Sequence, residues 1–327
     1  MKGIRMKDKN RISRRDFMCG TVAAAAFSVA GISIGGEAVA EPKAQPRPSG
    51  ADGIRMWQYA RGDTDEFYNY GLKVVPPWTE GGHLLINFPE HLEYMPGTRG
   101  ILRYSDKGAK GHWMVSEDGK KAELEVESVT EPGVFVHGKA RVVGKSRVDL
   151  SVKIINKTKA LTLDSIRPLY CFRYQTLKGF PQWVGNHEHT YFVKNGKLVA
   201  VPEFVCKDPE SQVKTATVVG CVQKNDSPFA ANYGGVIPDG IDAAISVVKS
   251  LDDKRCFILG WTPGKSSFTN ANIPCLHADP YYGSIKPGEA REVKGVVILS
   301  AEPAEKLVKE LIAEGVGAPA KMKAGKS

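Results

Sequence analysis

The stretch AELEVESV at residues 122–129 alternates between apolar and polar side chains from Ala122 to Glu127. Such alternation buries one face of a β-strand and leaves the other face in solvent. Another strand-like run, VFVHGKARVV at 134–143, follows the turn sequence EPG, and VDLSVKIIN at 148–156 alternates again. Consecutive strands joined by short turns favour antiparallel pairing. The centre of the chain therefore predicts an antiparallel sheet with one buried face.

Short strands and turns continue from about residue 53 to residue 299. Turn sequences include EDG at 117–119, PDG at 238–240 and KPG at 286–288, and KNG at 194–196 lies inside a predicted hairpin. The sequence shows no strand–helix–strand rhythm, no heptads and no internal repeat. We therefore predict an all-β fold, a large antiparallel β-sandwich of the supersandwich type over residues 53–315. Two packed β-domains that meet near residue 165 are the alternative.

One amphipathic helix is predicted near the C-terminus. Pro303 lies in its first turn and Gly315 ends it. The apolar stripe that would pack against the sandwich consists of Leu307, Val308, Leu311 and Ile312. Residues 316–327 are rich in Ala, Gly and Lys and are predicted to form a flexible basic tail.

The first 40 residues combine paired arginines in SRRDFM at 13–18, an apolar run over 21–34 and a small-residue cleavage site, AVA, at 38–40. This combination resembles a twin-arginine export signal. The resemblance implies a periplasmic or secreted protein that meets the twin-arginine export machinery. The apolar run is shorter than the roughly 20 residues that span a bilayer, so we expect cleavage, with a retained anchor as the alternative. Residues 41–52 are predicted to form a flexible leader, and no later segment predicts a transmembrane helix.

The formal net charge is +9, but the first 40 residues carry seven Lys or Arg and three Asp or Glu, which leaves about +5 for the mature chain. The remaining basic residues are scattered and form no stripe with interleaved aromatics, which argues against a nucleic-acid partner. The sequence also lacks a phosphate-binding loop and a nucleophile elbow.

Five cysteines remain after residue 40, and no Cys-x-x-Cys pair occurs among them. Zinc-ribbon and thioredoxin-like sites are therefore not expected. We predict that the cysteines are small buried side chains, with one disulfide as the alternative in an exported protein. They are Cys171, Cys206, Cys221, Cys256 and Cys275.

The most polar short segment is GNHEHTY at 185–191. If it is a strand, His187 and His189 lie about 7 Å apart on one face and can share a metal ion. Glu188 then faces the other way as a candidate catalytic carboxylate. The alternative is an edge strand or loop with solvated histidines.

A second polar cluster lies between residues 270 and 283. His277 could complete a three-histidine site for one divalent metal ion with His187 and His189, and Asp279 could serve as fourth ligand or base. Asn272 and Tyr281 are candidate substrate-binding residues, because polar and aromatic loops often carry binding groups. The alternative is a structured loop in which these side chains cap turns and cover the core.

A third set surrounds residue 173. Alternation places Tyr170 and Tyr174 on one face of a strand and Arg173 on the other. Arg173 could pair with a uronate carboxylate, while these tyrosines, Trp183 and Trp261 could stack on sugar rings. Core packing is the alternative for the aromatic residues. Other polar residues in the N-terminal third are isolated and are interpreted as structural: His83, Glu90, His91 and His112.

The sequences GW at 260–261, PCLH at 274–277 and KPGE at 286–289 precede an apolar strand at 296–299. Together with the leader they resemble a group of secreted bacterial β-sandwich proteins, and the closing turn is similar to that of galactose-mutarotase-like supersandwiches. The resemblance implies an extracytoplasmic protein that handles a carbohydrate.

Three functions from different classes remain. The first is a metal-assisted polysaccharide lyase or glycoside hydrolase. In a lyase, Arg173 or the metal neutralises the uronate while a Tyr or His takes the proton. In a hydrolase, Glu188 and Asp279 form the carboxyl pair. The second is a non-catalytic glycan-binding sandwich, and the third is a structural protein of the cell envelope.

Overall fold

The structure is a computed structural model. It describes residues 52–58, 71–78, 81–95, 99–103, 111–182, 186–205, 217–222, 235–237, 239–270 and 273–320. By internal contacts the chain divides into residues 1–43 and residues 44–327, and the described residues all belong to the second unit. The predicted signal peptide therefore lies outside the described residues, as do Trp183, Cys206 and Asn272.

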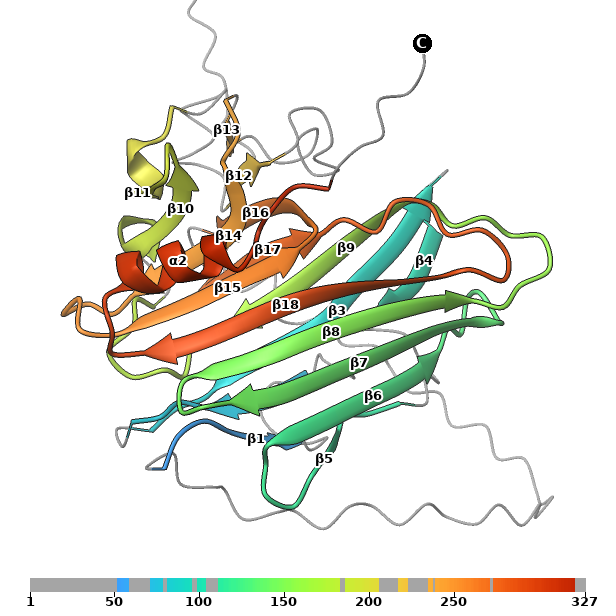
Figure 1. Ribbon diagram of the computed structural model, residues 1–327, viewed down its shortest axis with the longest axis horizontal. Coiled ribbons are helices and arrows are strands. Elements are labelled where there is room, and N and C mark those ends of the chain that lie inside the picture. Colours follow the sequence, from blue (N-terminus) through green and yellow to red (C-terminus); the bar gives the residue numbers. More distant parts are fainter. Residues whose placement is uncertain are drawn as a thin grey trace, which may run out of the picture. The chain divides into compact units, whose positions relative to one another are not determined.

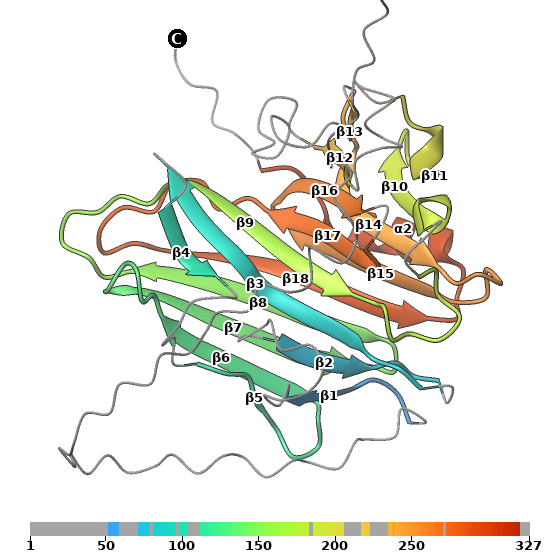
Figure 2. The ribbon, with the colours of Figure 1, turned by 180° about the vertical axis from the view of Figure 1, so that it is seen from behind.

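The described strands form two nine-stranded sheets that stack face to face (Figures 1 and 2). The first sheet has the order β1 (Arg55–Gln58), β2 (Gly71–Val75), β3 (Leu84–Met95), β9 (Asp164–Arg173), β17 (Cys275–Pro280), β16 (Gly264–Asn270), β12 (Thr217–Cys221) and β13 (Gly235–Ile237), with β4 (Arg99–Arg103) also paired to β3. The second sheet has the order β11 (Lys197–Ala200), β10 (Thr190–Lys194), β14 (Ala243–Lys249), β15 (Cys256–Thr262), β18 (Ala290–Ser300), β8 (Arg147–Asn156), β7 (Val134–Val143), β6 (Lys121–Glu127) and β5 (Met114–Val115).

The predicted β-sandwich is confirmed, and its cause is the alternation in the sequence. Strand β6 alternates between exposed and buried residues along its whole length. Buried side chains from both sheets meet in one core, for example Leu124, Val136, Leu150, Ile86, Phe172 and Leu276. Among the described strand pairs, β12 and β13 run parallel and the others run antiparallel.

The alternative of two β-domains is wrong, because both sheets mix strands from before and after residue 165. In the first sheet, β9 lies between β3 and β17. In the second sheet, β18 pairs with β8 over nine register positions, from Ala290 opposite Ile155 to Ile298 opposite Arg147. Only a single sandwich allows this interleaving.

The predicted hairpin is also present. Strands β10 and β11 pair up to Lys194 opposite Lys197. The two turn residues, Asn195 and Gly196, have φ angles of 51° and 69°. Positive φ at both positions is what a type I′ hairpin turn requires, and Asn followed by Gly supplies it at low cost.

The C-terminal helix α2 (Ala304–Ala313) lies against the outer face of the second sheet, beside β14 and β15 (Figure 1). Leu307, Val308 and Leu311 are buried there, as predicted. Ile312 is 40% exposed, so its place in the buried stripe was wrong. One residue turns a helix by about 100°, which carries Ile312 away from the face that Leu311 buries.

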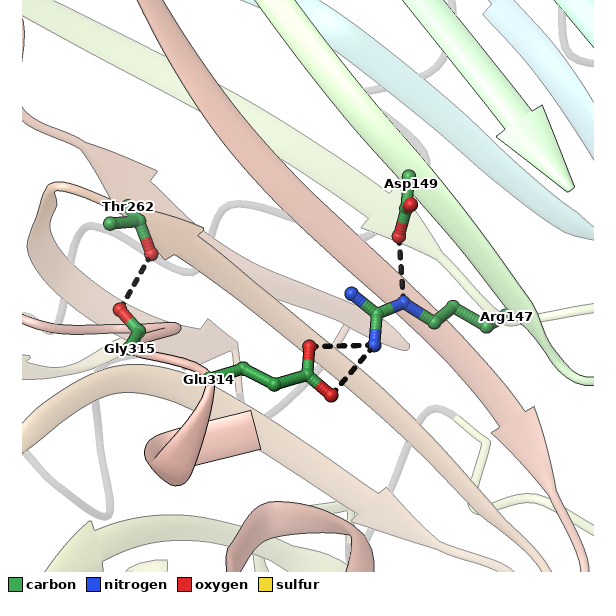
Figure 3. Close-up of polar contacts among 5 residues, drawn as sticks. All are labelled: Arg147, Asp149, Thr262, Glu314 and Gly315. Atoms are coloured by element: carbon green, nitrogen blue, oxygen red, sulfur yellow. Dashed lines mark hydrogen bonds and ion pairs between the residues drawn. The ribbon is translucent and has the colours of Figure 1, made fainter. Parts of the chain in front are cut away.

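The chain stays attached to the sandwich beyond the end of α2 (Figure 3). Arg147 donates to Asp149 at 2.7 Å and to Glu314 at 2.8 Å, and the Thr262 hydroxyl donates to the carbonyl of Gly315 at 3.0 Å. The Gly317 N–H donates to the carbonyl of Trp261. The prediction of a flexible tail from residue 316 is therefore wrong for residues 317 and 318, whose backbone groups hydrogen bond to Ala244, Trp261 and Gly264.

Among the described residues, no helix is long and apolar enough to cross a bilayer.

Candidate functional site

Part of the first sheet is buried on both faces. Every residue of β17 is buried, as are the first six residues of β16. Leu276 and Ala278 of β17 point into the core between the sheets. Their neighbours Cys275, His277 and Asp279 must therefore point to the outer face, the one turned away from that core.

The strand register brings further polar residues to this outer face. Cys275 lies opposite Arg173, and Cys171 lies opposite Asn87 on β3. A β-bulge follows Asn87, and Glu90 within it interacts electrostatically with His277 and Arg173. We call these residues the outer-face cluster: Asn87, Glu90, Cys171, Arg173, Cys275, His277 and Asp279.

Two cysteines and a histidine form the most compact part of the cluster. The ligand atoms of Cys171, Cys275 and His277 all lie within 4.8 Å of one another. The Cys275 Sγ lies 3.3 Å from the His277 Nε2 and accepts a hydrogen bond from the Asn270 amide at 2.9 Å. The His277 ring stacks on Phe268 with a centroid distance of 3.8 Å. These contacts fix the imidazole beside the sulfur.

The electrostatics favour charge separation between the sulfur and the imidazole. Hydrogen bonding from Cys171, together with the proximity of His277, lowers the pKa of the Cys275 thiol well below its usual value. The same hydrogen bond, together with burial, raises the pKa of the Cys171 thiol. Burial opposes protonation of His277, but the attraction of Cys275 outweighs it and raises the imidazole pKa. Both shifts favour a negative charge on the Cys275 sulfur and a positive charge on the His277 ring.

Two carboxyl groups face the same histidine. Asp279 accepts hydrogen bonds from the Tyr170 N–H at 3.2 Å and the Ser266 hydroxyl at 3.3 Å, and burial raises its pKa to about 7. Glu90 keeps part of its surface exposed, yet burial also raises its pKa, against the opposing charges of His277 and Arg173. Both carboxyls therefore hold a proton more readily than a solvated carboxyl does.

Arg173 and Asn87 complete the cluster. Arg173 is a partly exposed residue, and its guanidinium donates to Gln175. The Asn87 side chain is 1% exposed, and neither its amide oxygen nor its amide nitrogen has a hydrogen-bond partner. Buried polar groups in folded proteins are nearly always paired, so the Asn87 amide indicates that a hydrogen-bonding partner, such as a water or a ligand, binds at this face.

The structure brings together three of the four predicted catalytic residues, His277, Asp279 and Arg173. It does not bring Glu188 to them: Glu188 is exposed in η1 (Asn186–His189), a 3-10 turn. Residues 186–189 do not form the strand on which a shared His187–His189 metal ion would depend, and the turn agrees with the alternative of a loop. The Asn186 side chain donates to the carbonyls of Asn270 and Ile273, and the Thr190 hydroxyl donates to the Asn186 carbonyl, which together hold the chain in the turn.

The predicted three-histidine metal site is also wrong. A 3-10 turn has about three residues per turn, so His187 and His189 do not share a face as they would in a strand. Burial lowers the pKa of His187 to about 4, and the imidazole hydrogen bonds to the backbone of Thr269. Within the described ranges, the one group able to share an ion is Cys171, Cys275 and His277.

The aromatic residues predicted to bind sugar are part of the core. Tyr170, Tyr174 and Trp261 are fully buried between the sheets. The Tyr170 and Tyr282 hydroxyls lie 2.6 Å apart, and the Tyr170 ring lies 5.1 Å from Trp261. The prediction that Tyr170 and Tyr174 lie on one face of the strand and Arg173 on the other is confirmed. The face that carries the tyrosines packs into the core, so these residues do not bind sugar there. Tyr281 is partly exposed and follows β17, and its role stays a prediction.

Sequence reasoning missed four members of the cluster. Glu90 was interpreted as structural and the cysteines as small core residues, while Asn87 gave no signal. One signal was present, because Cys275 and His277 are two residues apart in a strand-forming sequence and so share a face. The place of Glu90 depends on a β-bulge, and the sequence pattern did not reveal it.

No family model matches the chain, and no curated protein matches it by sequence. Solved structures with similarity include the α-N-acetylgalactosaminidase NagBb of Bifidobacterium bifidum, with 8% identity and a TM-score of 0.40 over 81% of this chain and 38% of that one. A provisionally assigned aldose 1-epimerase of Escherichia coli K12 has 9% identity and a TM-score of 0.37 over 76% of this chain and 100% of that one. A polysaccharide lyase has 11% identity and a TM-score of 0.30 over 80% of this chain and 34% of that one. Similarity at this level carries no argument about activity.

Proposed function

We propose that this protein is an exported carbohydrate-active enzyme whose reactive groups are those of the outer-face cluster. The observation that carries the proposal is the meeting of Glu90, Arg173 and Asp279 around His277, from three strands far apart in sequence. Burying charged groups is costly, and a sandwich that needed only a core would gain nothing from placing them there. The cluster therefore favours an enzyme over a structural envelope protein.

The two carboxyls suit acid–base chemistry. One carboxyl can take a proton from the substrate while the other gives a proton to the leaving oxygen. Burial raises the pKa of both Glu90 and Asp279, which supports proton exchange closer to neutral pH. Glu90 replaces Glu188 as the partner of Asp279, because Glu188 lies in the exposed η1 turn.

A uronate-containing polysaccharide is the substrate class we favour, and β-elimination is the reaction. The guanidinium of the partly exposed residue Arg173 can pair with a uronate carboxylate. One carboxyl of the cluster then removes the proton beside that carboxylate. The electron pair forms a carbon–carbon double bond as the glycosidic oxygen leaves, and the other carboxyl protonates that oxygen. A hydrolase that uses the same carboxyl pair is the second reading of this geometry.

A non-catalytic glycan-binding role has less support. It was predicted from aromatic side chains, and Tyr170, Tyr174 and Trp261 are buried in the core. Location outside the cytoplasm is supported by the twin-arginine-like leader at residues 13–40.

The test is turnover of a polysaccharide panel by the protein recovered from its export route. The panel holds uronate-containing and neutral polysaccharides, and the assay follows new reducing ends and the ultraviolet absorbance of unsaturated products. We expect unsaturated products from a uronate substrate, and a loss of about 100-fold or more in Asp279→Asn and Glu90→Gln.

Glu188→Gln is the matched control, since it removes an exposed carboxyl of the same type, and it should keep full activity. Full activity in folded Asp279→Asn and Glu90→Gln would overturn the assignment. Reducing ends without unsaturated products would replace elimination with hydrolysis.

A further inference from the structure

We propose that Cys171, Cys275 and His277 bind one thiophilic metal ion of the zinc type. The proposal does not depend on the carbohydrate activity proposed above. It uses the two cysteine thiols, which that activity leaves without a role.

The distances suit a tetrahedral ion. Zinc–sulfur bonds of about 2.3 Å and zinc–nitrogen bonds of about 2.0 Å place neighbouring ligand atoms roughly 3.3 to 3.8 Å apart. The Cys275 Sγ and His277 Nε2 are 3.3 Å apart, and the three ligand atoms all lie within 4.8 Å of one another. Small side-chain movements therefore bring all three atoms to bonding distance of one ion.

The donor set selects the kind of ion. Two thiolates and one imidazole prefer zinc and similar soft or borderline ions, whereas magnesium and calcium prefer oxygen ligands. The cysteines come from the neighbouring strands β9 and β17, so the sheet holds the donors in place before any ion arrives. Such a preorganised set differs from a pair of cysteines on a mobile loop.

Unpaired polar atoms at the cluster are an independent observation that points to a missing ligand. Asn87, opposite Cys171 across the β3–β9 pair, is 1% exposed, and both of its amide atoms lack partners. Orphaned buried groups are expensive, and a water coordinated to a bound ion would give the Asn87 amide a partner.

Three protein donors leave the fourth coordination position of a tetrahedral ion open. Three protein ligands plus a free position is the pattern of catalytic zinc sites, whereas structural sites use four protein ligands. Glu90 is not one of the three clustered donors, but it interacts electrostatically with Cys275 and His277, so the fourth position is left for a water beside its carboxyl group.

The experiment is metal analysis of the folded protein, purified without chelator and then reconstituted with zinc. We expect about one equivalent of zinc per chain. Replacement by cobalt(II) should give thiolate-to-cobalt charge-transfer absorption, a readout that needs no variant and no substrate. Cys275→Ser and His277→Gln should each lose most of the bound metal.

Matched controls are Cys256→Ser, a buried free cysteine on β15, and His187→Gln, a partly buried histidine in η1, and both should keep one equivalent. The proposal is overturned if the reconstituted protein holds no stoichiometric zinc and shows no charge-transfer band. A Cys171–Cys275 disulfide in the purified protein, seen as two missing thiols, would also overturn it. Metal content is measured without substrate, so this result stands apart from success or failure of the polysaccharide assay.

Discussion

The outer faces of the two sheets differ sharply. On β6 in the second sheet, every second residue is exposed, and the outer face carries Glu123 and Glu125 in solvent. On β17 in the first sheet, the outer face carries Cys275, His277 and Asp279, and all are buried. Both faces are polar, but only the polar groups on β17 are removed from water, and this desolvation costs free energy.

The difference shows which polar residues are informative. Charged side chains on β6 and β7 keep their water, and their ion pairs are long and exposed, as in Lys139 to Glu123 at 3.7 Å. Such a face needs no function to explain it. Titratable groups that stay buried side by side need a specific reason, and binding or catalysis is the usual one.

The largest expected effect tests whether Trp261, on β15 of the second sheet, lies in the core between the sheets or on a sugar-binding surface. Trp261→Ala removes a fully buried indole between the sheets. We expect a loss of about 3–5 kcal/mol in the free energy of unfolding, from lost burial and the cavity left behind. Denaturant unfolding measures it, with Met114→Ala, at a position 60% exposed, as a near-neutral control. A near-neutral Trp261→Ala would return this residue to the sugar-binding face.

The next effect concerns the burial of His187, the η1 residue whose imidazole hydrogen bonds to the backbone of Thr269 on β16. Burial depresses the His187 pKa from 6.5 to about 4. Between pH 6.5 and pH 4 the unfolded chain takes up this proton and the folded chain does not, so stability falls as the pH falls through that window. The loss at the acid end reaches up to about 3 kcal/mol, and His187→Gln should lack it. Unfolding curves of both proteins at several pH values measure it. If the difference in free energy of unfolding between the two proteins stays constant with pH, the burial of His187 is contradicted.

A smaller effect tests Arg173 as the uronate partner. Arg173→Gln keeps a planar polar group but removes the charge. We expect a fall of about 10- to 100-fold in kcat/KM for a uronate polysaccharide, from loss of a charge-assisted pair. Lys153→Gln, an exposed outer-face position on β8, is the control and should change little. If both variants lose activity equally, general attraction by positive charge explains the effect better than a specific pair.

The smallest effect is expected on the solvated face. A double-mutant cycle on Lys139 and Glu123 should give a coupling energy below about 0.5 kcal/mol, because both side chains are about two-thirds exposed. Thermal unfolding of the four proteins of the cycle measures it. A coupling above about 2 kcal/mol would mean that the solvated face is also a structured polar network.

The sequence was enough to predict the sandwich, because the alternation in strands such as β6 and β8 is local and strong. It was also enough to single out His277 and Asp279, although their segment was expected to be a loop and is strand β17, and Arg173 on a predicted strand. It could not show that β9 and β17 are neighbours, because that pairing joins positions about a hundred residues apart. Without the pairing, Cys171 and Cys275 had no visible connection.

The errors have local physical causes. His187 and His189 follow Asn186, whose side chain bonds to distant backbone carbonyls and favours a turn over a strand. Tyr170 and Arg173 lie on a strand with few exposed residues, so alternation separated the two faces without showing which one is the core. Glu90 reaches the cluster through a bulge that shifts the register between Asn87 and His91.

A crystal structure of the protein purified without chelator, with anomalous data collected at the zinc edge, is the most direct test of the outer-face cluster. We predict one anomalous peak within about 2.5 Å of the sulfurs of Cys171 and Cys275 and of a ring nitrogen of His277, with Glu90 and Asp279 on the same outer face. A Cys171–Cys275 disulfide with no peak, or a register that separates these residues, would contradict it.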